Sequence, residues 1–148
     1  MKKLLSIAAL SLAVSAPAMA GSWSINQLGT ATVMNNKYEF NKFAVAAYDM
    51  DNNTVYFGRA MNKNDKLDTC YSGIKTQLFV DNQLVTFSQS FDSDVYCCYY
   101  HPVSDKAKKF ILKEFINKNR VVWNGRVLSA KGFIKTVDKS WSYHKNAI

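Results

Sequence analysis

The chain has 148 residues, of which 48% are hydrophobic and 20% are charged, and it contains only six glycines and two prolines. These counts describe a globular protein and exclude a disordered or collagen-like one. After the first twenty residues, no apolar run approaches the roughly twenty residues that a helix needs to span a bilayer, which excludes a polytopic membrane protein. The length fits one compact domain whose core needs no structural metal.

The first twenty residues predict a secretory signal peptide. Two lysines precede an apolar run over residues 4–14, which is too short to cross a membrane, and Ala18 and Ala20 place small residues where signal peptidase cleaves. Cleavage there leaves a single exported domain over residues 21–148. The short basic start and the Ala-x-Ala ending resemble those of Gram-negative signal peptides, so we expect a periplasmic or secreted protein.

The mature protein is expected to be moderately basic. Removing residues 1–20 takes away two lysines and no acids, so the 19 basic residues fall to 17 against 11 acidic ones. A positive surface raises the rate of encounter with anionic components of the cell envelope, such as lipopolysaccharide. Because the lysines are dispersed, the simpler interpretation is that they keep the protein soluble. The densest basic stretch comprises Lys106, Lys108, Lys109, Lys113 and Lys118.

The first two thirds of the mature chain predict antiparallel strands and hairpins. Apolar residues alternate with polar ones, and Asn, Asp and Gly interrupt the runs. Asp51-Asn52-Asn53 and Asp81-Asn82-Gln83 are expected to form hairpin turns, because Asn and Asp tolerate positive φ. Residues 62–68 are expected to form a loop. The predicted strands cover residues 23–28, 30–34, 43–50, 54–61, 74–80, 84–90 and 94–100.

A helix is predicted over residues 104–119, where apolar residues recur at spacings of three and four. Ser104 is a suitable N-cap, and Asp105 lies at the positive end of the helix dipole. We expect the helix to pack on the sheet through Val103, Ala107, Phe110, Ile111 and Phe115. We expect its solvent side to carry Lys106, Lys109, Lys113 and Lys118.

The last part of the chain is predicted to contain a hairpin, followed by a segment that is either a helix or a strand. Asn124-Gly125 separates two short apolar runs, and a type I′ turn needs positive φ at both central positions. Residues 133–138 form either a short helix or a last strand, and the tail from Lys139 is expected to fray. The predicted fold is mainly β (α+β): an antiparallel β-sandwich or curled sheet with one amphipathic helix packed on it.

The last third of the chain resembles the invasion-associated locus B family of exported bacterial proteins. The shared order is a cysteine-containing strand from Cys97, a helix that begins at a serine, a hairpin, and then Ala130-Lys131-Gly132-Phe133. The resemblance implies an exported, non-catalytic, β-rich domain connected in some bacteria with host-cell interaction. The first half lacks early cysteines expected of that family, so the resemblance implies a fold and no site residue.

The three cysteines predict one disulfide in an oxidising compartment. Cys97 and Cys98 point to opposite faces of a strand, so only one of them can bond to Cys70. Val95 lies on the same face as Cys97 and is expected to face the core, which favours Cys70–Cys97; Cys70–Cys98 is the alternative. The remaining thiol is free and buried, or redox-active, or forms a disulfide between two chains of a dimer.

No catalytic, cofactor-binding or metal site is predicted. Cys98 and His101 are close in sequence, but no third residue is evident that would orient the imidazole of a thiolate pair. The cysteines and His144 match no ordinary zinc spacing. The paired aspartates lie in or beside loops, where turn chemistry explains them. The protein is therefore expected to be non-enzymatic and to need no cofactor.

The aromatic residues suggest a binding face, since 14% of the chain is Phe, Trp or Tyr. Most of them are expected in the core and in cross-strand pairs. An exposed set among lysines would suit a protein partner or, as the second interpretation, an anionic component of the cell envelope; a thiol-dependent enzyme is the third. The exported compartment argues against nucleic acid. The candidate binding face comprises Tyr96, Tyr99, Tyr100, Lys106, Lys109 and Lys113.

Overall fold

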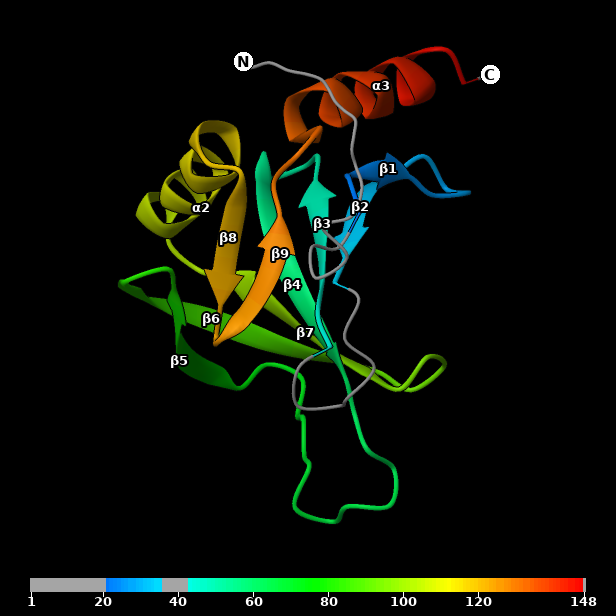
Figure 1. Cartoon of the computed structure of the whole chain (residues 1–148). Helices are drawn as coiled ribbons and strands as arrows, with labels where there is room; N and C mark the ends of the chain where they lie inside the picture. The colour runs from blue at the N-terminus through cyan, green and yellow to red at the C-terminus, as the bar shows by residue number, and fades with distance from the viewer. Residues whose placement is uncertain (1–20, 36–42, 148) are drawn as a thin grey trace.

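The computed structural model describes residues 21–35 and 43–147, so the predicted signal peptide lies outside the described residues. No helix in these two ranges is long and apolar enough to cross a membrane. The elements are β1 (Ser24–Ile25), β2 (Ala31–Met34), β3 (Val45–Asp49), β4 (Thr54–Ala60), β5 (Lys75–Val80), β6 (Gln83–Asp92), β7 (Cys97–Pro102), α2 (Asp105–Asn117), β8 (Arg120–Trp123), β9 (Arg126–Ser129) and α3 (Phe133–Lys145) (Figure 1).

All the strands belong to one antiparallel sheet in the order β1-β2-β3-β4-β7-β6-β5-β8-β9, and the sheet curls into a half-barrel. The mainly β prediction is confirmed in its curled-sheet form, with a second helix added. Both helices lie toward one end of the half-barrel, whereas the β8–β9 turn and the loop after β4 lie toward the other (Figure 1). We call the end without helices the open end.

The predicted turns close three of the hairpins. Asn53 and Asp81 adopt positive φ after β3 and β5, and Asn124 and Gly125 adopt φ of 47° and 77° between β8 and β9. The Asn-Gly pair therefore has the positive φ at both positions that a type I′ turn requires. Local turn chemistry fixes the register of these hairpins.

Aromatic side chains fill the concave side of the sheet. Phe57, Phe87 and Trp123 are fully buried, and the rings of Phe57 and Trp123 stack with centroids 5.0 Å apart. Phe115 of α2 adds a ring 6.1 Å from that of Phe57. Because successive residues of a strand point to opposite faces of the sheet, the neighbours of each of these strand aromatics point toward the outer face.

Helix α2 forms where it is predicted. The Ser104 hydroxyl accepts a hydrogen bond of 3.0 Å from the backbone N–H of Ala107, which confirms the N-cap. Ile111 and Phe115 are buried, and Ala107 and Phe110 are half-buried. The expectation for Val103 is wrong, because it precedes the N-cap and is 41% exposed. The predicted solvent side is confirmed for Lys106, Lys109, Lys113 and Lys118, all of which are exposed.

Residues 133–138 belong to a helix, and the expected fraying from Lys139 is wrong because α3 continues to Lys145. Buried hydroxyls hold this helix in place: Thr136 donates to the Trp23 carbonyl at 3.1 Å, and Ser140 donates to the Gly29 carbonyl at 2.6 Å. Trp23 also donates its indole N–H to the Ser129 carbonyl at 2.8 Å. These contacts join the beginning and the end of the domain.

The disulfide joins Cys70 to Cys98, and Cys97 keeps a free thiol. The preferred pairing of Cys70 with Cys97 is therefore wrong, and the alternative is correct. Val95 lies in a turn, is 59% exposed and does not belong to β7. Tyr96 has a φ of 53°, so the alternation of faces starts afresh at Cys97 and places Cys98 toward the core.

Candidate binding site at the open end of the half-barrel

The three tyrosines of the candidate binding face do not share one face. Tyr100 is buried in the core, Tyr99 is half-buried on the outer face, and Tyr96 lies in the turn before β7. The ring of Tyr96 packs against Phe91, and the ammonium group of Lys63 lies 5.1 Å from the ring centroid. The lysines of this face, Lys106, Lys109 and Lys113, lie on the exposed side of α2.

The structure separates Cys98 from His101. Cys98 is oxidised and faces the core, whereas His101 lies on the outer face, where its ring stacks on that of Tyr56 with centroids 4.7 Å apart. Burial lowers the pKa of His101. Within residues 21–35 and 43–147, no group of three or more His, Cys, Asp or Glu side chains could hold a metal ion.

The free thiol of Cys97 lies beside Tyr99 and Asp92 on the outer face. Burial, followed by the charge of Asp92, raises the pKa of Cys97, although a hydrogen bond with Tyr99 opposes this shift. Burial first, then the neighbouring Cys97 and Asp92, raises the pKa of Tyr99 to about 12. A nucleophilic cysteine must be a thiolate near neutral pH, so this environment does not activate the thiol.

A different set of polar residues meets at the open end. We call it the arginine site, and it consists of Arg59, Asp68, Tyr100, Trp123 and Arg126. Val55 and Phe57 of β4 face the core, so alternation turns Arg59 inward at the end of the strand. Trp123 and Arg126 flank the β8–β9 turn, which lies at the same end (Figure 1).

Every nitrogen of the Arg59 guanidinium donates at least one hydrogen bond. Its Nε donates to the Tyr100 hydroxyl at 2.9 Å, and its Nη1 donates to Asp68 Oδ1 at 2.7 Å. A longer bond of 3.4 Å runs from Nη2 to the Thr69 carbonyl. Burial alone would lower the pKa of Arg59, but the bonds to Tyr100 and Asp68 outweigh it and the pKa is raised. Arg59 is thus a buried charge with its counter-charge in place.

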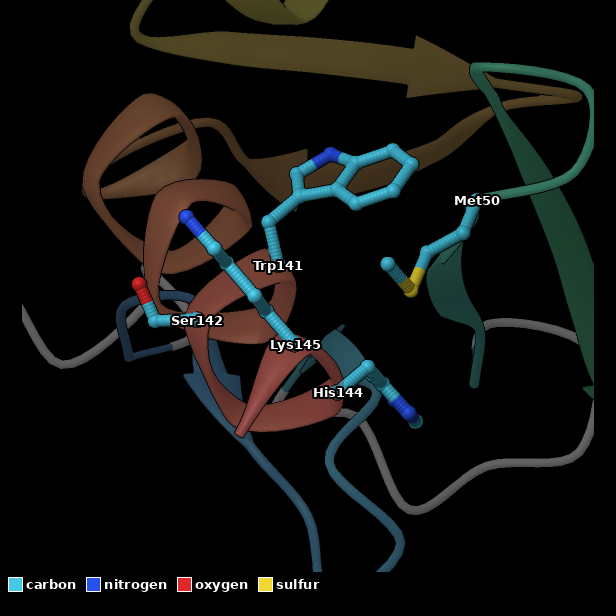
Figure 2. Close-up of a pocket in the computed structure, with 5 residues that line it drawn as sticks. All are labelled: Met50, Trp141, Ser142, His144 and Lys145. Atoms are coloured by element: carbon cyan, nitrogen blue, oxygen red, sulfur yellow. The ribbon is translucent and has the colours of Figure 1, made fainter. Parts of the chain in front are cut away.

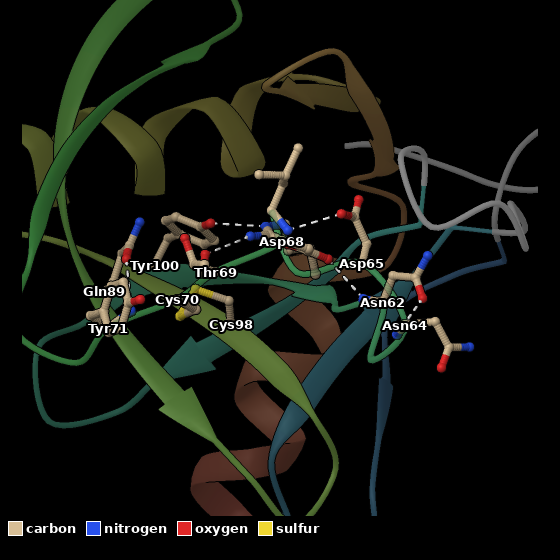
Figure 3. A network of polar contacts seen from close by, with 12 residues as sticks. Asn62, Asn64, Asp65, Asp68, Thr69, Cys70, Tyr71, Gln89, Cys98 and Tyr100 are labelled. Carbon is tan, nitrogen blue, oxygen red and sulfur yellow. Dashed lines mark hydrogen bonds and ion pairs between the residues drawn. A yellow bond between two sulfur atoms is a disulfide. The ribbon is translucent and has the colours of Figure 1, made fainter.

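The loop after β4 holds Asp68 against Arg59. The second carboxylate oxygen of Asp68 accepts a 2.7 Å bond from the backbone N–H of Asn62, and Asp65 accepts one of 2.9 Å from the N–H of Leu67. Cys70, which forms the disulfide with Cys98, lies two residues after Asp68. Figure 3 shows Asp68 and Thr69 close to Tyr100, with the Cys70–Cys98 bond beside them. The bond from Asn62 and the disulfide at Cys70 therefore hold the loop on both sides of Asp68.

Arg126 forms no ion pair within residues 21–35 and 43–147, although the charge of Asp68 acts favourably on it. Its guanidinium lies over the Trp123 ring, 5.5 Å from the centroid, and its Nη1 donates a 3.3 Å bond to the Asn124 carbonyl. Its Nε is buried and has no acceptor among the described residues, as is also true of the Trp123 indole nitrogen. Burial, followed by the charge of Arg59, lowers the pKa of Arg126. The two arginines thus differ: Arg59 forms an ion pair with Asp68, whereas Arg126 forms none with the part of the chain that the structure describes.

Among the surface hollows of the described residues, one lies beside α3 and another lies at the open end. The hollow beside α3 measures about 580 Å³, and Figure 2 shows its lining of Met50, Trp141, Ser142, His144 and Lys145. The hollow at the open end measures about 500 Å³ and contains both arginines. It is lined by Arg59, Asn62, Asp65, Leu67, Asp68, Asn124 and Arg126.

Of the five residues of the arginine site, the sequence predicts only Tyr100 as part of a binding face. It does so because the side chain is aromatic, whereas in the structure the hydroxyl group makes the contact with Arg59. Arg59 carries a local signal, because it continues the inward alternation of Val55 and Phe57 although it is charged. Arg126 directly follows the Asn-Gly turn, close to Trp123. Asp68 carries no local signal, since an aspartate in a polar loop is ordinary turn chemistry.

No family model, curated protein sequence or solved structure matches the chain. The resemblance of residues 97–133 to the invasion-associated locus B family therefore stays a prediction. Any functional interpretation therefore rests on the geometry of the arginine site.

Proposed function

We propose that this chain is a small exported, non-catalytic binding protein that acts on another protein through the open end of its half-barrel. The observation that carries the proposal is the state of Arg126, a half-buried charge whose Nε has no acceptor within the described chain. A buried charge is unfavourable unless it is paired and hydrogen-bonded. A partner that places an acidic group beside the guanidinium would offset this penalty at the moment of binding.

The surroundings of Arg126 support a protein partner. Arg is enriched among the residues that dominate protein interfaces, and Arg126 is held in place by packing on the buried ring of Trp123. Leu67 borders the same hollow and is 91% exposed, which offers an apolar contact at the rim. A hollow of about 500 Å³ suits a protruding side chain better than a flat membrane surface.

Export is supported by the leader pattern and by the covalent structure. The Cys70–Cys98 disulfide fits an oxidising compartment, because cytoplasmic thiols are kept reduced. From these two observations we propose a periplasmic or secreted location in a Gram-negative bacterium.

A second candidate function is binding to an anionic surface such as lipopolysaccharide. The observation that favours it is the row of exposed lysines on α2, Lys106, Lys109 and Lys113. These lysines lie on a helix at the opposite end from the arginine site (Figure 1). The two candidate functions can therefore be tested by separate substitutions.

The proposed function predicts that Arg126→Gln weakens capture of a partner, whereas substitution of the lysines does not. Immobilised mature protein would be used to retain proteins from periplasmic and host-cell extracts. We expect Arg126→Gln to weaken retention by about tenfold or more through faster dissociation, because it removes a buried charged anchor. Arg120→Gln, which removes an exposed charge from the same hairpin, is the matched control and should retain the partner.

Charge reversal of Lys106, Lys109 and Lys113 should at most slow association. The second candidate replaces the first if this triple variant loses the partner while Arg126→Gln keeps it. The same conclusion follows if the wild-type protein retains only lipopolysaccharide or anionic vesicles, in a manner that high salt abolishes.

A further inference from the structure

We propose that Arg126 is the receptor for a single carboxylate group, which binds in the hollow at the open end. This inference rests on the proposed function and deepens it by naming the chemistry that the partner presents to the arginine site. The carboxylate would belong to an aspartate or glutamate side chain or to the end of a polypeptide chain.

An anion is indicated by the donors that Arg126 leaves unused. A guanidinium has five N–H donors in a planar fork and no acceptor. Of these, one bonds the Asn124 carbonyl at 3.3 Å, and Nε has no acceptor among the described residues although it is buried. Asn124 and Arg126 both line the hollow, so an anion bound there would lie beside the incompletely paired fork.

Arg59 shapes this site without being its receptor. Each of its three nitrogens donates one bond, to Tyr100, Asp68 and Thr69, and the Asp68 carboxylate already neutralises its charge. Its positive charge nevertheless acts on Arg126, since it contributes to the lowered pKa of that side chain. An anion close to Arg126 would offset this repulsion between the two arginines.

The charge of the hollow favours a carboxylate over a doubly charged anion. Asp65 and Asp68 line the same hollow as the two arginines. The four charges sum to zero, so the second charge of a dianion adds a desolvation cost without adding net attraction. A carboxylate carries one charge and matches the fork of an arginine with two parallel hydrogen bonds.

The experiment measures binding of small anions to the mature, disulfide-bonded protein at low ionic strength. The readout is the NMR signal of the Arg126 Nε–H, assigned by its loss in Arg126→Gln. The probes are N-acetylglycine, which mimics a chain end, a glutamate with both backbone ends capped, and sulfate. We expect the carboxylates to shift this signal saturably and to bind at least about threefold more tightly than sulfate. The tighter of the two carboxylates identifies the source.

Three variants separate recognition from charge and from folding. For these variants, binding is followed through the backbone amide of Asn124. We expect Arg126→Gln to weaken carboxylate binding by about tenfold, and Arg126→Lys by several-fold because it keeps the charge and loses the fork. Arg120→Gln should bind within about twofold of the wild type. Unchanged backbone amide spectra away from the hollow show that each variant folds.

Two results would overturn the inference. If sulfate binds as tightly as the carboxylates, the site is a general anion site and the carboxylate assignment is wrong. If none of the probes shifts the Arg126 signal, or if Arg126→Lys binds as tightly as the wild type, Arg126 is not a carboxylate receptor. Neither result affects retention of a partner by the wild-type protein, so the proposed function would still stand or fall on that separate measurement.

Discussion

Phe115→Ala is expected to lower the free energy of unfolding by roughly 3–5 kcal/mol, the range for emptying an aromatic site in a core. Phe115 is 1% exposed, and its ring lies 5.4 Å from Trp23 and 5.5 Å from Phe133. The side chain thus joins α2 to the start of the domain and to α3. Denaturant unfolding of the mature protein, followed by circular dichroism, measures this effect.

Phe110→Ala is the matched control, since it removes the same side chain from the same helix. Phe110 is only half-buried, so its loss should cost about 1–2 kcal/mol. An equal loss of unfolding free energy in the two variants would contradict the burial of Phe115. It would mean that α2 faces the core with a different side.

Cys70→Ser is expected to destabilise the protein by about 3–4 kcal/mol. The Cys70–Cys98 bond closes a loop with a sequence separation of 28, and closing a loop of this size restricts the unfolded chain by about that much. The loss should also loosen the loop that holds Asp68 against Arg59. Denaturant unfolding gives the free energy, and non-reducing peptide mapping of the wild type identifies the bonded pair.

Cys97→Ser is the control for the disulfide prediction. Its thiol is free and half-buried, so the substitution should change stability by less than about 0.5 kcal/mol. Recovery of a Cys70–Cys97 peptide, or a larger loss for Cys97→Ser than for Cys70→Ser, would contradict the pairing.

Features that depend on a few neighbouring residues could be predicted from the sequence. The positive φ of Asn124 and Gly125 and the N-cap of Ser104 follow from local chemistry, and both are confirmed. The alternating runs indicate the strands, and a mainly antiparallel sheet follows from them. The choice between a β-sandwich and a curled sheet could not be made from the sequence, because it depends on how distant strands pair.

The failures have tertiary causes. A four-residue turn before β7 restarted the alternation, so Val95 gave the wrong face for the disulfide. The polar residues Thr136 and Ser140 hold α3 through hydrogen bonds to distant carbonyls, which no apolar pattern reveals. The arginine site joins residues 59, 68, 100, 123 and 126 through the pairing of β4 with β7 and the position of one hairpin. Its central feature, an arginine that forms no ion pair with the described residues, is visible only once Asp68 is seen to pair with Arg59.

The most direct test of binding at the open end is backbone hydrogen exchange of the mature protein with and without the retained partner. Binding at the arginine site predicts slower exchange in residues 62–69 and 120–129, and unchanged exchange in the first two turns of α2. Protection confined to α2, or to the hollow beside Trp141, would contradict the assignment of the binding site to the open end.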